Sequence, residues 1–229
     1  MYRKAIQIPQ EGWKLSGVFR ELQDVAGEAA SQWKAAGEDL KQLGLMWVVV
    51  RYEVCFERPV LSGENLCFQT WALPFRHKMS QRNVLLLDPD GETVLKAAGV
   101  WAVVDRETRK MIEPADYPLS FGTEVGDISL SRPSAPEKTE LMHQLTYAVQ
   151  EADLDMNLHM NNTRYFDLAE SVLPASDREK QLRLVRAAFF NEARQGETIE
   201  LSWGEKRNVR FFSGKKDDTA CFEVSLHYA

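Results

Sequence analysis

The sequence predicts an α+β protein made of two similar units, each an antiparallel sheet wrapped around a long helix. A helical pattern followed by several strand patterns occurs twice along the 229 residues. A segment with four prolines between positions 114 and 136 separates the two occurrences and contains few apolar runs. We therefore expect a first domain over residues 1–118, a linker over 119–138 and a second domain over 139–229.

The first helical pattern runs from Ser16 to about Leu43, where the chain contains no proline. Apolar residues recur there about every 3.6 positions, which places them on one face of a helix. The segment is therefore predicted to be a long amphipathic helix, with Gly37 as the place for a break. The buried stripe is predicted to consist of Val18, Leu22, Val25, Ala26, Ala29, Trp33 and Leu40.

Segments rich in β-branched and aromatic residues follow this helix, separated by turn formers such as LSGEN and DPDGE. In the second of these turns, Pro89 supplies a fixed φ and Gly91 tolerates a positive one, so the flanking runs can pair as a hairpin. We expect successive antiparallel strands over 45–56, 65–73, 82–88 and 93–105.

The second half repeats this order of elements. A strand-like segment over 141–150 leads to a helix in which Tyr165, Leu168, Ala169 and Val172 have helical spacing. Further strands are expected over 183–190, 198–204 and 220–228, with 209–213 as another candidate.

Composition argues against several classes of protein. A net charge of −6 and a pI near 5.4 are unusual for a general nucleic-acid binder. The chain has no apolar run of membrane-spanning length and no secretory signal at its start, so we expect a cytoplasmic protein without a membrane segment. Cys55, Cys67 and Cys221 are scattered, and the four histidines lack ligand spacing. Reduced thiols, no metal and no cofactor are therefore expected.

One polar cluster could support catalysis. Asp155, Asn157 and His159 alternate, so in an extended segment their side chains would project to one side. Asn161 or Asn162 could then cap the following helix, whose free N–H groups can polarise a carbonyl oxygen. The alternative is a turn in which the Asp and Asn side chains only satisfy backbone groups and the imidazole caps or packs.

The resemblance to a known family begins at these residues. DLDMNLHMNNTRY, residues 153–165, resembles the acyl–acyl-carrier-protein thioesterase motif DLDxNxHVNNxxY. In the first half, WVVVRYEVCFERPVLSGENLCFQTW and GVWAVVDRETRK resemble further segments of this family, which includes the plant FatA and FatB enzymes. The resemblance implies a tandem, or double, hotdog fold, and the absence of a transit segment suggests a bacterial member.

The resemblance also implies site residues. Asp155, Asn157 and His159 would belong to the catalytic network, with Glu192 as its second carboxylate. Plant members often have Cys after that Glu, whereas this chain has Ala193, which excludes a cysteine nucleophile there. Glu192 would act as general base toward water, while Asp155 either holds the network or attacks directly to form an anhydride. The oxyanion would be bound by N–H groups at Asn161, Asn162 and Thr163.

The first half lacks such a polar set, which suggests that it binds the acyl chain. Its candidate liners are Val18, Leu22, Val25, Trp71 and Trp101, although the same residues could simply form core. An acidic acyl carrier protein would need a basic patch. The candidates are Arg76, His77, Lys78 and Arg82; Arg178, Lys180, Arg183 and Arg186; or Lys206, Arg207 and Arg210.

The expected function is hydrolysis of an acyl-carrier-protein thioester to free fatty acid and holo carrier, which terminates fatty acid synthesis. The alternatives are an acyl-coenzyme A thioesterase, a hotdog hydratase and a non-catalytic acyl-binding hotdog protein. A chain with both units already contains the interface that single units make by pairing, so either a monomer or a homodimer is expected. The sequence does not predict the preferred acyl chain length.

Overall fold

The computed structural model describes residues 1–113, 128 and 130–229, so much of the expected linker lies outside the described residues. The chain forms two compact units. The first comprises Met1–Gly12 and Arg20–Pro133, and the second comprises Trp13–Phe19 and Ser134–Ala229. The change of unit after Pro133 falls inside the segment expected as linker, but the second unit also takes seven residues from the N-terminal part of the chain.

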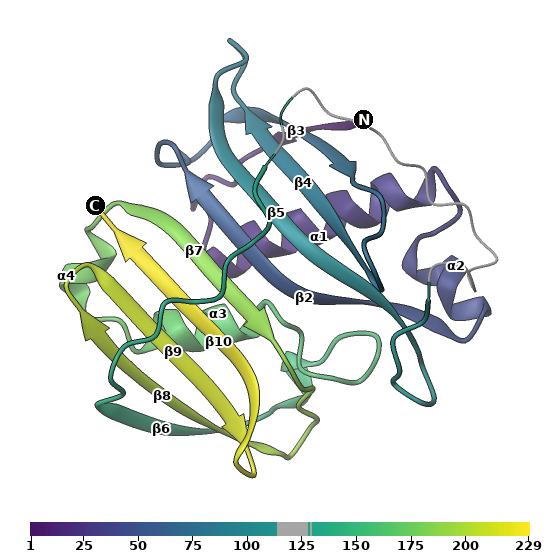
Figure 1. Ribbon diagram of the computed structural model, residues 1–229. Helices are drawn as coiled ribbons and strands as arrows, with labels where there is room; N and C mark the ends of the chain where they lie inside the picture. The colour runs from purple at the N-terminus through teal and green to yellow at the C-terminus, as the bar shows by residue number, and fades with distance from the viewer. Residues whose placement is uncertain (114–127, 129) are drawn as a thin grey trace. The chain divides into compact units, whose positions relative to one another are not determined.

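The first unit contains an antiparallel sheet with the strand order β1-β3-β4-β5-β2 (Figure 1). Four of its strands lie where the sequence predicts them, and β1 is an addition that the sequence analysis missed. The strands are β1 (Tyr2–Gln7), β2 (Leu45–Phe56), β3 (Asn65–Ala72), β4 (Met79–Leu87) and β5 (Thr93–Asp105).

The predicted long helix is two helices, α1 (Leu15–Ser31) and α2 (Gly37–Gln42). Lys34 adopts a left-handed φ of 52°, and the N–H groups of Lys34 and Ala35 donate to the carbonyls of Ser31 and Ala30. This pair of bonds satisfies the last carbonyls of α1 and ends it. The prediction of a continuous stripe is therefore wrong at Trp33, which is 43% exposed.

One face of the first sheet is turned toward α1, which lies behind the strands in Figure 1. Tyr2 and Lys4 of β1 both hydrogen-bond Glu28 of α1, at 2.8 and 2.7 Å. Their partners in β3, Thr70 and Phe68, project to the same face because paired residues share a side of the sheet. We call this the α1 face.

The opposite face of the same sheet is crossed by the segment that leaves the first unit. Gln81 donates from Nε2 to the carbonyl of Leu130 at 3.1 Å, and Arg51 donates from Nη1 to that of Pro133 at 3.3 Å. Figure 1 shows this segment passing over the strands on the side away from α1.

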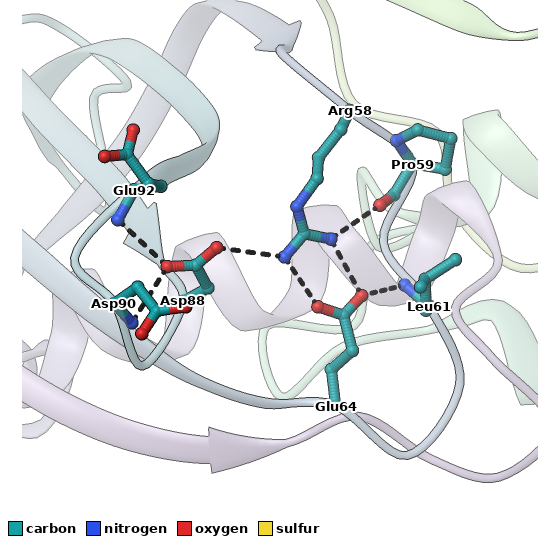
Figure 2. Close-up of polar contacts among 7 residues, drawn as sticks. All are labelled: Arg58, Pro59, Leu61, Glu64, Asp88, Asp90 and Glu92. Atoms are coloured by element: carbon teal, nitrogen blue, oxygen red, sulfur yellow. Dashed lines mark hydrogen bonds and ion pairs between the residues drawn. The ribbon is translucent and has the colours of Figure 1, made fainter.

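Arg58 ties two turns of the first unit together (Figure 2). Its guanidinium binds both carboxylate oxygens of Glu64, at 3.0 and 2.7 Å, and reaches Asp88 at 3.4 Å. Asp88 begins the predicted hairpin turn and accepts the N–H groups of Asp90 and Glu92 at 3.1 and 2.9 Å. The turn after β2 is thus joined to the turn between β4 and β5.

The second unit contains an antiparallel sheet in the order β7-β10-β9-β8-β6. Its main helix, α3 (Arg164–Ser171), is shorter than the long helix expected, because the chain reaches Pro174 and begins α4 (Ala175–Arg178). A short 3₁₀ turn spans Glu151–Asp153. The strands are β6 (His143–Ala148), β7 (Leu182–Phe189), β8 (Thr198–Lys206), β9 (Val209–Lys216) and β10 (Thr219–Tyr228).

Candidate active site

The segment with the alternating polar residues is a tight turn, so the expectation of an extended segment is wrong. Leu154 and Met160 form an isolated antiparallel bridge, and the N–H of Asp155 donates to the carbonyl of His159 at 2.8 Å. Leu158 adopts a φ of 63°. Oδ1 of Asp155 accepts the N–H groups of Asn157 at 2.8 Å and of His159 at 3.3 Å, an arrangement that competes with extended backbone.

This turn brings the imidazole of His159 to the second predicted carboxylate. Nε2 of His159 lies 2.9 Å from Oε2 of Glu192. The imidazole side chain is 8% exposed, whereas the Glu192 side chain is 38% exposed. The buried ring thus contacts a carboxylate that is accessible to solvent. Of the candidate catalytic residues, His159 and Glu192 are in direct contact.

Backbone contacts fix Glu192 on the sheet of the second unit. Phe190 donates its N–H to the carbonyl of Cys221 at 2.9 Å, and Met160 donates its own to Ala193 at 2.7 Å. Lys216 donates from Nζ to the Glu192 carbonyl at 3.3 Å. Because these bonds hold the chain on both sides of Glu192, its carboxylate is positioned by β10 and by the turn that carries His159.

Asp155 and Asn157 occupy the turn itself. Besides the two N–H groups on Oδ1, Asp155 accepts the Asn157 amide on Oδ2 at 3.5 Å. The contacts of the Asp155 carboxylate in the described part of the chain therefore lie within the turn. The Asp155 side chain holds the backbone that presents the imidazole.

The start of α3 differs in detail from the expectation. Thr163, and not Asn161 or Asn162, is the N-cap residue. The N–H of Asn161 donates to the carbonyl of Asp153 at 2.8 Å, and the N–H of Thr163 donates to Oδ1 of Asn161 at 3.0 Å. Of the three N–H groups predicted to bind an oxyanion, the one without an acceptor among the described residues is that of Asn162.

Asp153 is a site residue that sequence reasoning missed. It is 1% exposed and accepts the Tyr147 hydroxyl at 2.6 Å, the Gln150 N–H at 2.9 Å and Nε of Arg164 at 2.9 Å. Burial alone would raise the pKa of Asp153, but these hydrogen bonds outweigh it and lower the pKa. Since Asp153 also binds Asn161 through its carbonyl, it joins β6, the turn and α3. Its place at the start of the motif was the available signal.

The candidate acyl liners do not all share a surface. Leu22 and Val25 are fully buried in the first unit, whereas Val18 belongs to the second. Trp101 lies on the α1 face, where its ring meets that of Tyr52 edge-on at 5.9 Å. Trp71 follows Thr70 in β3, so its side chain projects to the opposite face.

Several candidate basic residues have structural partners. Arg210 is 8% exposed and binds both oxygens of Asp177, at 2.6 and 3.1 Å, while Lys180 binds the same carboxylate at 2.6 Å. Arg82 lies on the α1 face of its sheet and not on the outer surface. The side chain of Arg178 lies outside the described residues.

Arg76, from the first of the three predicted basic clusters, lines an open cavity of about 220 Å³ in the first unit. Arg76 and Arg132 lie on its wall beside Met79 and Gln81, with Leu73, Pro74 and Leu130 completing the lining. In the described part of the chain neither arginine forms an ion pair with a carboxylate, and Arg132 donates from Nη2 to Sδ of Met79 at 3.7 Å. Lys78 forms an ion pair with Glu113 at 3.1 Å.

Cys221 is fully buried, which raises the pKa of its thiol, and Ala193 has no thiol at all. Among the described residues, no helix combines the length and apolar character needed to cross a membrane, and no three metal-binding side chains converge.

Two sheet-and-helix units, with a histidine–carboxylate pair on the second, define a double-hotdog protein. Two solved structures share this fold across the whole chain. An acyl-ACP thioesterase from Bacteroides thetaiotaomicron has a TM-score of 0.81 at 19% identity, covering 100% of this chain and 97% of its own. The 12:0-ACP thioesterase from Umbellularia californica has a TM-score of 0.82 at 16% identity, covering 100% and 96%.

Sequence comparison gives the family. Residues 9–117 match the acyl-ACP thioesterase N-terminal domain and residues 136–220 match the C-terminal domain, so the chain belongs to the acyl-ACP thioesterase family. The chloroplastic acyl-[acyl-carrier-protein] hydrolase FATB2 of Cuphea viscosissima is 24% identical over 168 residues, 68% of this chain and 40% of the relative. The chain thus spans less than half the length of the curated relatives it matches.

Proposed function

We propose that the protein hydrolyses the thioester of a fatty acyl chain on its acyl carrier protein, releasing free fatty acid and holo carrier and so terminating fatty acid synthesis. The observation that carries this proposal is the 2.9 Å contact between His159 and Glu192 on a turn that bears the family motif. A buried imidazole bound to an accessible carboxylate is suited to activating water.

In the proposed reaction, Glu192 takes a proton from water and the water oxygen attacks the thioester carbonyl carbon. His159 donates to Glu192 and keeps its carboxylate oriented. The N–H of Asn162, which precedes the N-terminus of α3, donates a hydrogen bond to the carbonyl oxygen as that oxygen becomes negatively charged. When the tetrahedral species collapses, the carbon–sulfur bond breaks and the leaving thiolate takes the proton from Glu192.

Asp155 is assigned a positioning role in this proposal. Both of its carboxylate oxygens accept hydrogen bonds inside the turn, two of them from backbone N–H groups. A carboxylate engaged in this way is a poor nucleophile because attack would cost those bonds. The geometry therefore supports the water route over an anhydride at Asp155.

The docking surface for the carrier and the place of action are proposed from basic side chains and cysteines outside the catalytic pair. An acidic carrier would dock where basic side chains lack a carboxylate partner, and Arg76 and Arg132 at the 220 Å³ cavity meet that description in the described part of the chain. The three cysteines are free, as is usual in a reducing compartment such as the cytoplasm, which is the proposed place of action. We propose that one chain with both units suffices for activity.

The test is release of free fatty acid from matched panels of acyl-carrier-protein and acyl-coenzyme A substrates of different chain length. Wild type is compared with His159→Ala and Glu192→Gln, and exposed Glu200→Gln of β8 serves as the control. Hydrolysis that favours the carrier panel, is lost in both site variants and persists in the control would support the proposal. Preference for coenzyme A substrates would reassign the substrate, and a folded but inert wild type would indicate a non-catalytic acyl-binding protein.

A further inference from the structure

Arg82 is a charged side chain on the interior face of the first sheet. It pairs with Gly99 of β5 and with Ala72 of β3. Its neighbours two residues away on the same face of β4 include Val84, which pairs with Thr70. Since Thr70 lies on the α1 face, Arg82 also projects toward the side covered by α1.

The surroundings of Arg82 combine small residues with a polar group. Gly99 and Ala72 flank it across the strands, so no bulky side chain stands beside it in its own row. The ring of Tyr52 packs over Gly99, where an added Cβ atom would come within 2.5 Å of the ring. The row therefore presents a guanidinium and a phenol on either side of a glycine.

Much of the α1 face around this row is apolar. Phe68, Val84, Leu86 and Ala97 project from it, and each is at most 2% exposed. An apolar interior of this kind, in the unit that lacks the catalytic turn, is suited to an acyl chain. A charged group inside it is expensive unless something compensates it.

The described residues supply little compensation for the charge of Arg82. In the described part of the chain the one hydrogen-bond partner of the guanidinium is Oγ1 of Thr70, at 3.4 Å, and no carboxylate lies close. Burial lowers the pKa of Arg82 to about 10, so the group still carries its charge at neutral pH. In the described part of the chain its other N–H donors have no hydrogen-bond partner, and the side chain is half-buried, so a bound molecule can reach them.

We infer that Arg82 determines substrate specificity by binding an oxygen substituent, a carboxylate or a hydroxyl, on the distal part of the acyl chain. This inference rests on the proposed function. A planar guanidinium can bind a carboxylate through two parallel hydrogen bonds, or a hydroxyl through one. The preferred substrates are thus oxygen-bearing acyl chains, and a plain methyl-ended chain leaves the charge uncompensated.

The test uses carrier-bound acyl chains of one length that end in a methyl, a hydroxyl or a carboxyl group. Wild type, Arg82→Met and Arg82→Lys are compared, with Arg3→Met as control, since Arg3 is an exposed arginine of β1. We expect kcat/KM of the wild type to favour an oxygen-bearing chain by about tenfold or more, as expected for one charged hydrogen bond. Arg82→Met should reverse that preference, and Arg3→Met should keep it. The hydroxyl and carboxyl arms identify which oxygen is bound.

Calorimetric binding of the corresponding free acids gives a readout that does not need hydrolysis. The oxygen-bearing acids should bind more tightly than the methyl-ended acid to wild type and lose that advantage in Arg82→Met. Equal handling of all chain ends by wild type and Arg82→Met would overturn the inference, because water alone would then solvate Arg82. Hydrolysis of plain chains in that case would leave the proposed function intact, whereas absence of all hydrolysis would overturn the proposed function.

Discussion

Met160 and Ala193 are joined by a backbone hydrogen bond of 2.7 Å, and each lies next to a residue of the proposed catalytic pair. His159 precedes Met160, and Glu192 precedes Ala193. The bond therefore couples the turn before α3 to the segment between β7 and β8 immediately beside the point where imidazole and carboxylate meet at 2.9 Å. Two segments separated by more than thirty positions form one site through their backbones.

The first prediction concerns this pair. Glu192→Gln and His159→Ala should each lower kcat by about 10²–10⁴-fold, since general base catalysis has that magnitude. The double variant should lose little more than the worse single variant, because residues that act as a unit are not additive. Single-turnover kinetics of the three variants measure this, and full additivity would show that the two side chains work independently.

Asp155 offers a test that separates positioning from nucleophilic attack. Asp155→Asn retains an oxygen that can accept the N–H groups of Asn157 and His159, whereas Asp155→Ala retains none. We expect Asn to keep most of kcat and Ala to lose about tenfold or more as the turn loosens. If Asp155 formed an anhydride, both variants would be equally inactive because neither retains the attacking carboxylate.

The depressed pKa of Asp153 predicts a pH dependence of stability. A carboxyl whose folded pKa lies below its usual value of 3.8 stabilises the fold fully above that value and loses the contribution as pH falls through the folded pKa. Asp153→Asn should therefore lower the free energy of unfolding by about 1–3 kcal/mol at neutral pH, and less at pH ~3. Denaturant titrations from pH ~3 to ~7 check this; a difference that stays constant with pH would contradict it.

Two glycines form a matched pair for testing the packing of the strands. A Cβ atom at Gly214 of β9 would come within 2.0 Å of Cε1 of Phe222, whereas one at Gly27 of α1 would meet nothing within 4 Å. Gly214→Ala should lower the free energy of unfolding by about 1–3 kcal/mol or more. Gly27→Ala should raise it by up to about 1 kcal/mol because alanine favours helix. Thermal unfolding of both variants measures the change in the free energy of unfolding, and equal changes would contradict the packing argument.

Much of the fold could be predicted because strand patterns and turns are local. Segments such as 45–56 and 93–105 alternate or run apolar over a full strand, and β2 and β5 coincide with them. The end of α1 could not be predicted, since Lys34 adopts a left-handed conformation that usually favours glycine. The break was therefore expected at Gly37, the nearest glycine. Strand β1 was missed because it is short and acquires its partner β3 only about sixty positions later.

The members of the candidate site could be proposed from the sequence, whereas their geometry could not. The polar motif suggested His159 and the family resemblance suggested Glu192, and the structure brings these two side chains into contact. Asp155 and Asn157 meet in a turn, which depends on the left-handed Leu158 and on the backbone hydrogen bond from Met160 to Ala193, a residue outside the motif. Asp153 was overlooked because burial and its three side-chain hydrogen bonds depend on Tyr147 and Arg164 folding around it.

The seven residues Trp13–Phe19 belong with the second unit although they precede most of the first in the chain. Phe19 stacks on Phe166 with ring centroids 3.8 Å apart, so the core of the second unit includes a ring from α1. Recombination at the linker would therefore not exchange whole modules. A chimera that takes residues 134–229 from this chain and the remainder from a relative would inherit a foreign residue against Phe166, so halves of this protein are expected to be interchangeable only when that N-terminal segment moves with the second half.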